Sequence, residues 1–307
     1  LSPPCMDLVW LWIPATLVAA AAQAGRNAVQ RGLTASLGTL GATQVRFLFG
    51  FPFALLYLLI VCLLAGETPP GVNTPFLLFV LGGAVAQIAA TALMLAAMRD
   101  RSFVVVTAWT KTEPIQVALF GFAVLGDPLS PVGMLAVVLA TLGVVLMSAR
   151  PAGDVQAAGL RPAWLGLLSG AGFALSAVCF RGAILKLDGG MFAVQATWTL
   201  CWSLGVQVLI LMTWMLLCNR PLLRACAAAW RASIWGGFLG ATASQAWFIG
   251  FALTAAANVR TLGLVEVLFA QALSQKLFAH APSRRETAGI ALIVVGVLLL
   301  LLAAGQR

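Results

Sequence analysis

The sequence predicts an all-α integral membrane protein with ten transmembrane helices, arranged as two inverted five-helix repeats. Hydrophobic residues make up 62% of the 307 residues and charged residues only 9%, whereas a soluble protein carries charge on roughly a quarter of its positions. The apolar residues form successive stretches of about 20, the length that a helix needs to cross a bilayer. In addition, the second half of the chain repeats the pattern of the first half.

Ten apolar stretches are the expected membrane spans. They cover residues 8–28, 40–64, 76–98, 103–124 and 131–149 in the first half, and 163–182, 192–217, 232–254, 259–279 and 287–304 in the second. These spans should be helices, because lipid cannot satisfy a free backbone amide. Glycine and proline residues separate several of them, as in the loops at 66–71 and 126–131.

The two halves keep a common register. Glu113 lines up with Glu266, and Gly143 lines up with Gly296, at a shift of 153 residues. Five crossings is an odd number, so the second repeat must enter the bilayer in the opposite orientation. We therefore divide the chain into an N-terminal tail (1–7, with the native start expected at Met6), a first repeat (8–149), a linker (150–162) and a second repeat (163–307).

Several motifs resemble the EamA repeat of the drug/metabolite transporter superfamily. In the first half they are Thr112-Glu113-Pro114, the loop Leu125-Gly126-Asp127-Pro128-Leu129 and the glycine-bearing helix that follows. The second half is similar at Val265-Glu266-Val267-Leu268-Phe269 and at Gly296, but it lacks the proline after the glutamate. The acidic loop residue of that family corresponds to Asp127 in one half and to His280 in the other.

Within this superfamily the chain is most similar to YddG-like amino-acid exporters. This resemblance lies in Val29-Gln30-Arg31-Gly32 after the first span, and in Gln245-Ala246-Trp247 with Gly250 in the eighth. Gln23 departs from it, because the group often carries an aromatic residue there. The resemblance implies amino-acid export, a bacterial inner-membrane location and both termini inside. The positive-inside rule instead places both termini outside, because most loop arginines follow odd-numbered spans.

Polar side chains within the spans are the candidates for substrate binding, since a membrane disfavours them unless they are paired or used. Gln23 and Asn27 are four residues apart and share a helix face. The full candidate set is Gln23, Asn27, Gln87, Trp109, Glu113, Gln245, Trp247 and Glu266. The alternative for the amides is hydrogen bonding between helices, and the alternative for Trp247 is core packing.

Glu113 and Glu266 occupy equivalent repeat positions, so the pseudo-two-fold axis could place both near a central cavity between the repeats. Each could bind an amino group or carry a proton in coupled transport. The alternative is a structural ion pair, for example with Arg46 or Lys111. Trp109 lies one predicted helical turn before Glu113, where an indole beside a carboxylate would suit a zwitterion with an apolar side chain.

Paired glycines recur at the start of two predicted spans, Gly82-Gly83 in the third and Gly236-Gly237 in the eighth. Glycine lets two helices approach closely, because it has no side chain to hold the backbones apart. We expect close helix packing at both pairs, with a hinge for rocking motions as the alternative.

Other chemistries find little support. The six cysteines show no CxxC spacing and His280 is the one histidine, so no metal site is expected. The chain has no GxxxxGK[ST] phosphate loop and no arrangement of nucleophile and base, so we expect neither an ATP-driven pump nor an enzyme. The net charge of +9 is explained by loop arginines facing anionic lipid, without nucleic acid.

The sequence therefore predicts an alternating-access carrier that exports small organic solutes, with aromatic or other neutral amino acids favoured. Its partners would be the solute and membrane lipid, it would need no cofactor, and a monomer is expected. A multidrug or other metabolite exporter is an alternative, favoured if tryptophans dominate the cavity. An alternative of another class is a non-transporting membrane scaffold or sensor, in which helix packing uses all the inward polar residues.

Overall fold

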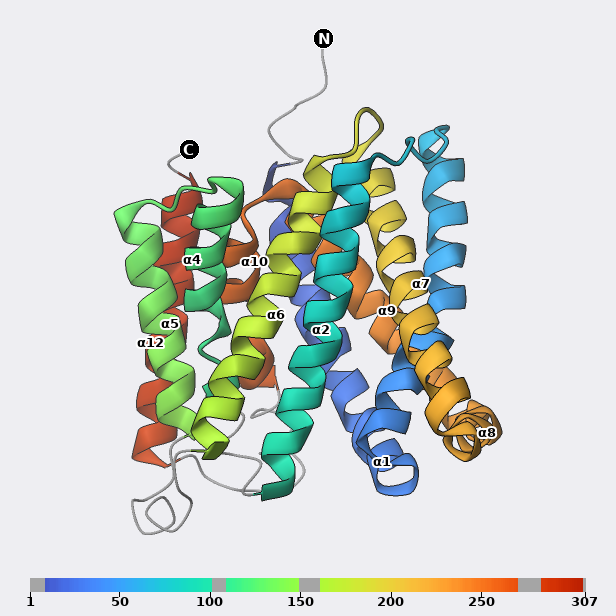
Figure 1. The fold of residues 1–307 in the computed structure, drawn as a ribbon. Coiled ribbons are helices and arrows are strands. Elements are labelled where there is room, and N and C mark those ends of the chain that lie inside the picture. The colour runs from blue at the N-terminus through green and yellow to red at the C-terminus, as the bar shows by residue number, and fades with distance from the viewer. Residues whose placement is uncertain (1–8, 101–108, 149–160, 270–282, 306–307) are drawn as a thin grey trace. The chain divides into compact units, whose positions relative to one another are not determined.

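The computed structural model describes residues 9–100, 109–148, 161–269 and 283–305, and every element in them is helical (Figure 1). The elements are η1 (Val9–Leu11), α1 (Trp12–Ala65), α2 (Thr74–Asp100), α4 (Glu113–Leu125), α5 (Pro131–Ser148), α6 (Arg161–Leu185), α7 (Phe192–Cys218), α8 (Arg220–Ala228), α9 (Trp230–Leu253), α10 (Ala256–Leu262) and α12 (Arg284–Gly305). The predicted tail 1–7, most of the linker and His280 lie outside the described residues, as do the side chains of Gln30 and Arg31.

The prediction of ten spans is confirmed only in part. The described residues contain five helices that are long and apolar enough to cross a membrane: Leu40–Ala65, Thr74–Met94, Trp164–Leu185, Phe192–Cys218 and Arg284–Gly305. Two shorter apolar helices, Glu113–Leu125 and Pro131–Met147, accompany them. The chain is thus an all-helical, multi-pass membrane protein whose helices differ in length more than the sequence indicated.

Helix α1 contains both the first and the second predicted span, which the sequence separated by a connection. A straight helix of 54 residues would be about 80 Å long, far longer than the roughly 30 Å core of a bilayer. Gly38 interrupts it with φ 67° and ψ 179°, a conformation that glycine adopts without a steric penalty. The two spans are therefore joined at a single glycine, and the residues before and after it remain helical.

The fourth predicted span, 103–124, is broken. Residues 101–108 lie outside the described part, Lys111 and Thr112 form a turn, and α4 begins only at Glu113. Pro114 explains this start. Proline lacks the N–H that a continuing helix requires and disfavours the helical conformation in the residue before it, yet it fits the first turn of a new helix.

The ninth predicted span, 259–279, is broken at the matching place. Helix α10 ends at Leu262, Gly263 and Leu264 form a turn, and residues 265–269 are helical again. Glycine is a poor helix former, so it favours an interruption at this point. In each half a helix break thus comes immediately before the segment that carries the repeat-equivalent glutamate.

The helices gather into two compact units, and each unit combines segments of both halves of the sequence. The first consists of Leu1–Val85 and Cys179–Thr254, and within it α1 packs along α9 and α7. The second consists of Ala86–Val178 and Ala255–Arg307, and within it α5 packs along α12 while α10 packs against α4. The division of the sequence into two repeats stays a prediction.

Glycines bring the helices of the first unit into close contact. A Cβ atom on Gly237 of α9 would lie 2.5 Å from the carbonyl carbon of Phe49 on α1. A Cβ atom on Gly83 of α2 would lie 2.6 Å from the Phe180 ring on α6. Both distances are shorter than side chains tolerate, so the predicted close helix packing is confirmed at one glycine of each pair.

The α5–α12 contact in the second unit is reciprocal. A Cβ atom on Gly143 would lie 2.9 Å from the backbone nitrogen of Ile293, and one on Gly296 would lie 2.7 Å from that of Ala140. Ile293 follows Ala140 by the same 153 residues that separate Gly296 from Gly143. This is the pattern expected when two equivalent segments meet across a two-fold axis.

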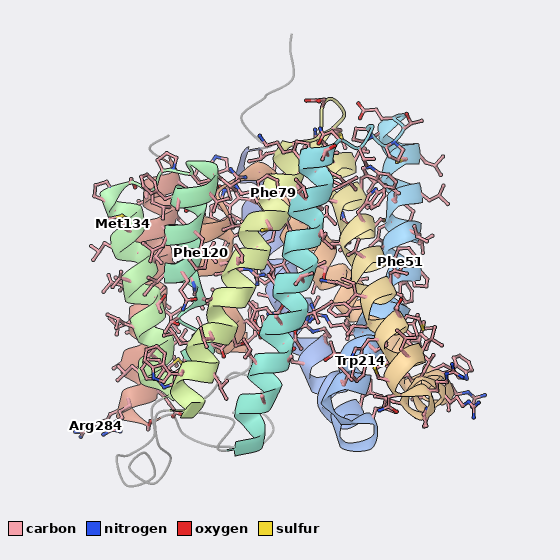
Figure 2. The ribbon with its side chains drawn as sticks, viewed as in Figure 1. Phe51, Phe79, Phe120, Met134, Trp214 and Arg284 are labelled. Carbon is pink, nitrogen blue, oxygen red and sulfur yellow. The ribbon has the colours of Figure 1, made fainter. Side chains whose placement is uncertain are left out.

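Large apolar side chains project from the helices into the surroundings (Figure 2). Met134 on α5 is 56% exposed and Trp214 on α7 is 44% exposed. Soluble monomers seldom expose extensive apolar surface, whereas a protein surrounded by lipid tails must. The exposure agrees with a multi-pass membrane protein.

Candidate functional site

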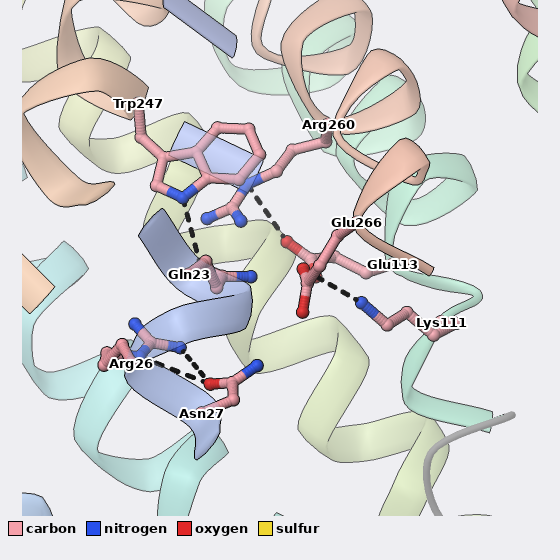
Figure 3. Close-up of polar contacts among 8 residues, drawn as sticks. All are labelled: Gln23, Arg26, Asn27, Lys111, Glu113, Trp247, Arg260 and Glu266. Atoms are coloured by element: carbon pink, nitrogen blue, oxygen red, sulfur yellow. Dashed lines mark hydrogen bonds and ion pairs between the residues drawn. The ribbon is translucent and has the colours of Figure 1, made fainter. Parts of the chain in front are cut away.

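In the first unit, two of the predicted site residues meet through a hydrogen bond (Figure 3). The indole Nε1 of Trp247 on α9 donates to Oε1 of Gln23 on α1 at 3.1 Å. Trp247 is buried, and a buried indole N–H needs an acceptor. The polar atom of a mid-helix tryptophan is thus held by an amide that the sequence places 224 residues away.

Gln245 lies two residues before Trp247 on α9 and belongs to a second polar pair. Its Nε2 donates to Oγ1 of Thr197 on α7 at 2.6 Å. Its Oε1 is buried and accepts no hydrogen bond from the residues that the structure describes. A buried acceptor of this kind requires a donor, which a bound water or a bound solute would supply. Thr197 was missed from the sequence, because threonine is common in helices that pack within membranes.

Asn27 lies four residues after Gln23 on α1, as predicted, but its side chain is hydrogen-bonded to the neighbouring Arg26. Nε and Nη2 of Arg26 donate to Oδ1 of Asn27 at 3.3 and 2.8 Å (Figure 3). Arg26 itself is buried on α1 and was not among the predicted site residues. Its charge lies beside the amide oxygen of Asn27.

In the second unit, Gln87 lies on α2 with Thr91 one turn later, so the two residues share a helix face. Thr91 donates to the backbone oxygen of Gln87 at 2.8 Å. The hydroxyl of Thr91 is therefore used within its own helix, and Gln87 remains the candidate of the two for a solute.

The prediction that Trp109 shares a helix face with Glu113 is wrong. The turn at Lys111 and Thr112 separates them, and the backbone oxygen of Trp109 accepts hydrogen bonds from both the backbone nitrogen and Oγ1 of Thr112 at 3.2 and 2.7 Å. The Trp109 side chain is 43% exposed. The cause is Pro114, which starts a new helix where the sequence analysis assumed a continuous one.

Two ion pairs link the helix breaks of the second unit (Figure 3). Nε of Arg260 lies 3.2 Å from Oε1 of Glu113, and Nζ of Lys111 lies 3.5 Å from Oε2 of Glu266. Lys111 and Glu113 belong to the break before α4, whereas Arg260 and Glu266 lie on either side of the break after α10. The cation of each break therefore pairs with the carboxylate of the other.

Both glutamates thus have a cation partner of the kind that the ion-pair alternative requires. Lys111 was an expected partner, whereas Arg260 was missed because its position at the start of the ninth predicted span suggested a loop. The side chains are 21% and 11% exposed in the Lys111–Glu266 pair, and 14% and 15% exposed in the Arg260–Glu113 pair. Two positive and two negative groups leave the four residues neutral as a set, which lowers the free energy of placing charge among apolar helices.

No metal centre is assigned. Across the described ranges, no three histidine, cysteine, aspartate or glutamate side chains lie close enough together to hold a metal ion. The charged groups that do cluster are two carboxylates with two cations, and such a set neutralises itself without an added ion.

Comparisons with known proteins address the fold and the family. Residues 10–149 match the model of the EamA-like transporter family, and no curated protein matches the chain. Among solved structures 28 chains match, including a crystal structure with 15% sequence identity and a TM-score of 0.65 that covers 98% of this chain and 99% of its own. At this identity the likeness shows the fold alone. The first half of the chain is thus similar to an EamA-like transporter domain, and the shared fold extends over nearly the whole chain.

Proposed function

We propose that the chain is a secondary transporter that exports small organic solutes, with aromatic and other neutral amino acids as the favoured class. The EamA-like match over residues 10–149 supports transport of small solutes. The observation that carries the proposal is the polar set inside apolar helices, above all the buried Gln245 oxygen that accepts no hydrogen bond from the described residues.

An amino acid has a polar end and a side chain, and the candidate residues suit both. In the first unit we propose contacts with Gln23, Asn27, Gln245 and Trp247, where amides bind the polar end and the indole contacts an apolar side chain. In the second unit the proposed contacts are Gln87, Trp109, Glu113 and Glu266. A multidrug exporter remains the second candidate, since Trp247 also suits aromatic cations.

Alternating access in the bacterial inner membrane completes the proposal. Two inverted repeats exchange conformations in carriers of this design, and the reciprocal contact of Gly143 and Gly296 supports the repeat. The direction of export follows from the solute gradient, or from protons carried by Glu113 or Glu266. The transporter needs no cofactor for either mode.

Flux in liposomes tests the proposal directly. Purified protein is reconstituted and the movement of radiolabelled aromatic and branched amino acids is compared with that in protein-free vesicles. We expect saturable flux that falls about tenfold in Trp247→Ala, because both the indole contact and the Gln23 hydrogen bond are lost. The matched control is Trp235→Ala on the same helix, which is 64% exposed and should leave flux unchanged.

Two outcomes would contradict this assignment. If folded wild-type protein moves no amino acid, amino-acid export is rejected, and cationic dyes and other metabolites become the next substrates to measure. If Trp247→Ala and Trp235→Ala reduce flux equally, Trp247 does not contact the solute.

Proton coupling has its own test. In the double variant Glu113→Gln, Glu266→Gln, neither residue can bind or release a proton, so the remaining flux should no longer respond to an imposed pH gradient. The measurement compares flux with and without the gradient, with Asp188→Asn, an exposed carboxylate, as the control. An unchanged response in the double variant would reject coupling through these glutamates.

A further inference from the structure

We propose that the four charged residues at the two helix breaks form a binding site for a zwitterion, in which Arg260 and Lys111 take the carboxylate of the solute and Glu113 and Glu266 take its ammonium group. This inference rests on the proposed function and narrows its substrates to solutes that carry both charges. It assigns a role in substrate binding to Arg260 and Lys111, which the sequence analysis left out of the site.

The two ion pairs are long enough to exchange partners. Strong charge-assisted contacts between nitrogen and oxygen are about 2.7 to 2.9 Å long and are often bidentate for arginine. Here the atoms lie 3.2 Å apart in the Arg260–Glu113 pair and 3.5 Å apart in the Lys111–Glu266 pair. The Arg260–Glu113 contact also lacks the alignment of a hydrogen bond. A solute that offers better geometry can therefore compete with these internal partners.

The position of the four residues favours a solute site over a structural brace. Each lies within or beside a break in a helix, where the regular backbone is interrupted. In carriers, discontinuous helices mark the places where substrates bind. All four side chains keep between 11% and 21% of their surface exposed, so they are not completely enclosed by the described residues.

Charge balance explains why a zwitterion is the favoured solute. The empty set is neutral, and a zwitterion keeps it neutral because it brings one charge of each sign. A solute with only an ammonium or only a carboxylate leaves one charge uncompensated among apolar helices, which is strongly unfavourable. The site should therefore discriminate against amino acids whose carboxylate or ammonium group has been blocked.

Glu67 and Glu286, two other glutamates of the described residues, have evident structural roles that Glu113 and Glu266 lack. Oε2 of Glu67 accepts a hydrogen bond from the backbone nitrogen of Met191 at 2.6 Å. Glu286 and Ser283 exchange hydrogen bonds at the start of α12, with Ser283 nitrogen donating to Glu286 Oε2 at 2.7 Å. Glu113 and Glu266 instead face cations across two breaks, an arrangement that neither caps a helix nor closes a loop.

The experiment measures inhibition of radiolabelled leucine flux in liposomes by three unlabelled probes: leucine, leucinamide and N-acetylleucine. Leucine carries both charges, leucinamide only the positive one and N-acetylleucine only the negative one. In the wild type, leucine should inhibit at a concentration about tenfold lower than either derivative, because each derivative loses one charge-assisted contact. Equal inhibition by all three probes would overturn the inference.

Variants of Arg260 test whether this residue binds the carboxylate of the solute. In Arg260→Gln the inhibitory concentration of leucine should rise about tenfold while that of leucinamide stays unchanged, since leucinamide has no carboxylate to lose. Arg260→Lys keeps the charge and should retain the preference, and it serves as the test if Arg260→Gln does not fold. Arg224→Gln, an exposed arginine on α8, is the control and should behave as the wild type.

The results separate this inference from the proposed function. Absence of flux for every amino acid rejects transport of amino acids and the zwitterion site together. If the Arg260→Gln variant still transports leucine and keeps its full preference for leucine over leucinamide, the zwitterion site alone is rejected. The assignment to amino-acid export then stands.

Discussion

Replacing Glu113 with glutamine should lower the free energy of unfolding by about 3 kcal/mol, because it leaves the Arg260 guanidinium without its carboxylate. Arginine keeps its charge at all accessible pH values, so it cannot adapt by losing a proton. Nε of Arg260 lies 3.2 Å from Oε1 of Glu113, and only 14% of the Arg260 side chain is exposed. Unfolding by SDS in mixed micelles, followed by tryptophan fluorescence, measures the loss.

A double-mutant cycle separates the ion pair from other effects of the substitution. Glu113→Gln combined with Arg260→Gln should recover most of the lost stability, because no charge is left unpaired by the change. Asp188→Asn removes an exposed carboxylate and should change stability by less than about 0.5 kcal/mol. If the losses of the two single variants simply add in the double variant, the two side chains do not interact.

Replacing Gly237 with alanine should destabilise the first unit by about 3 kcal/mol, the upper part of the range for overpacked positions. The added methyl group would lie 2.5 Å from the carbonyl carbon of Phe49 and 2.6 Å from its oxygen. These are backbone atoms of α1, so no side-chain rotation relieves the clash and the helices must move apart. Thermal unfolding in detergent, monitored by circular dichroism, measures the effect.

The neighbouring glycine provides the control. A methyl group on Gly236 would lie 3.6 Å from Cγ1 of Val29 and 3.8 Å from Cδ1 of Leu33, which are ordinary contacts. Gly236→Ala should therefore be neutral or stabilise the helix by up to about 1 kcal/mol, as alanine does in helix interiors. Equal destabilisation by both variants would show that the close approach of α1 and α9 does not determine the effect.

Composition and local pattern predicted the features that depend on neighbours in the chain. The apolar stretches indicated helices in lipid, and five of them are long enough to cross a membrane. Gly83 and Gly237 were expected at close helix contacts, because a glycine pair at the start of an apolar span has few other uses. The spacing of Gln23 and Asn27 correctly placed both on one face of α1.

Features that depend on a single backbone conformation were missed. Gly38 and Pro114 were visible in the sequence, but glycine and proline also occur within membrane helices, so neither residue by itself indicated a kink or a helix start. The common face of Trp109 and Glu113 failed for this reason, since it assumed that the helix continued across Lys111 and Thr112. The proline after Glu113 was the available signal.

Partners that are distant in the sequence could not be paired from it. Trp247 and Gln23 were both candidates, yet their hydrogen bond joins residues 224 positions apart. Lys111 was considered as a partner for either glutamate, because distance along the chain does not distinguish between equivalent acids. Arg260 had no distinguishing pattern, since arginines are also common in loops.

The reciprocal contact between α5 and α12 has an evolutionary consequence. Gly143 packs against Ile293, and Gly296 packs against Ala140, so each helix is at once the neighbour and the counterpart of the other. Because backbone atoms lie opposite both glycines, no smaller side chain on the neighbouring helix can make room for a larger residue at either position. If the halves arose by duplication, we therefore expect the sequences of the two copies to be most alike along this contact.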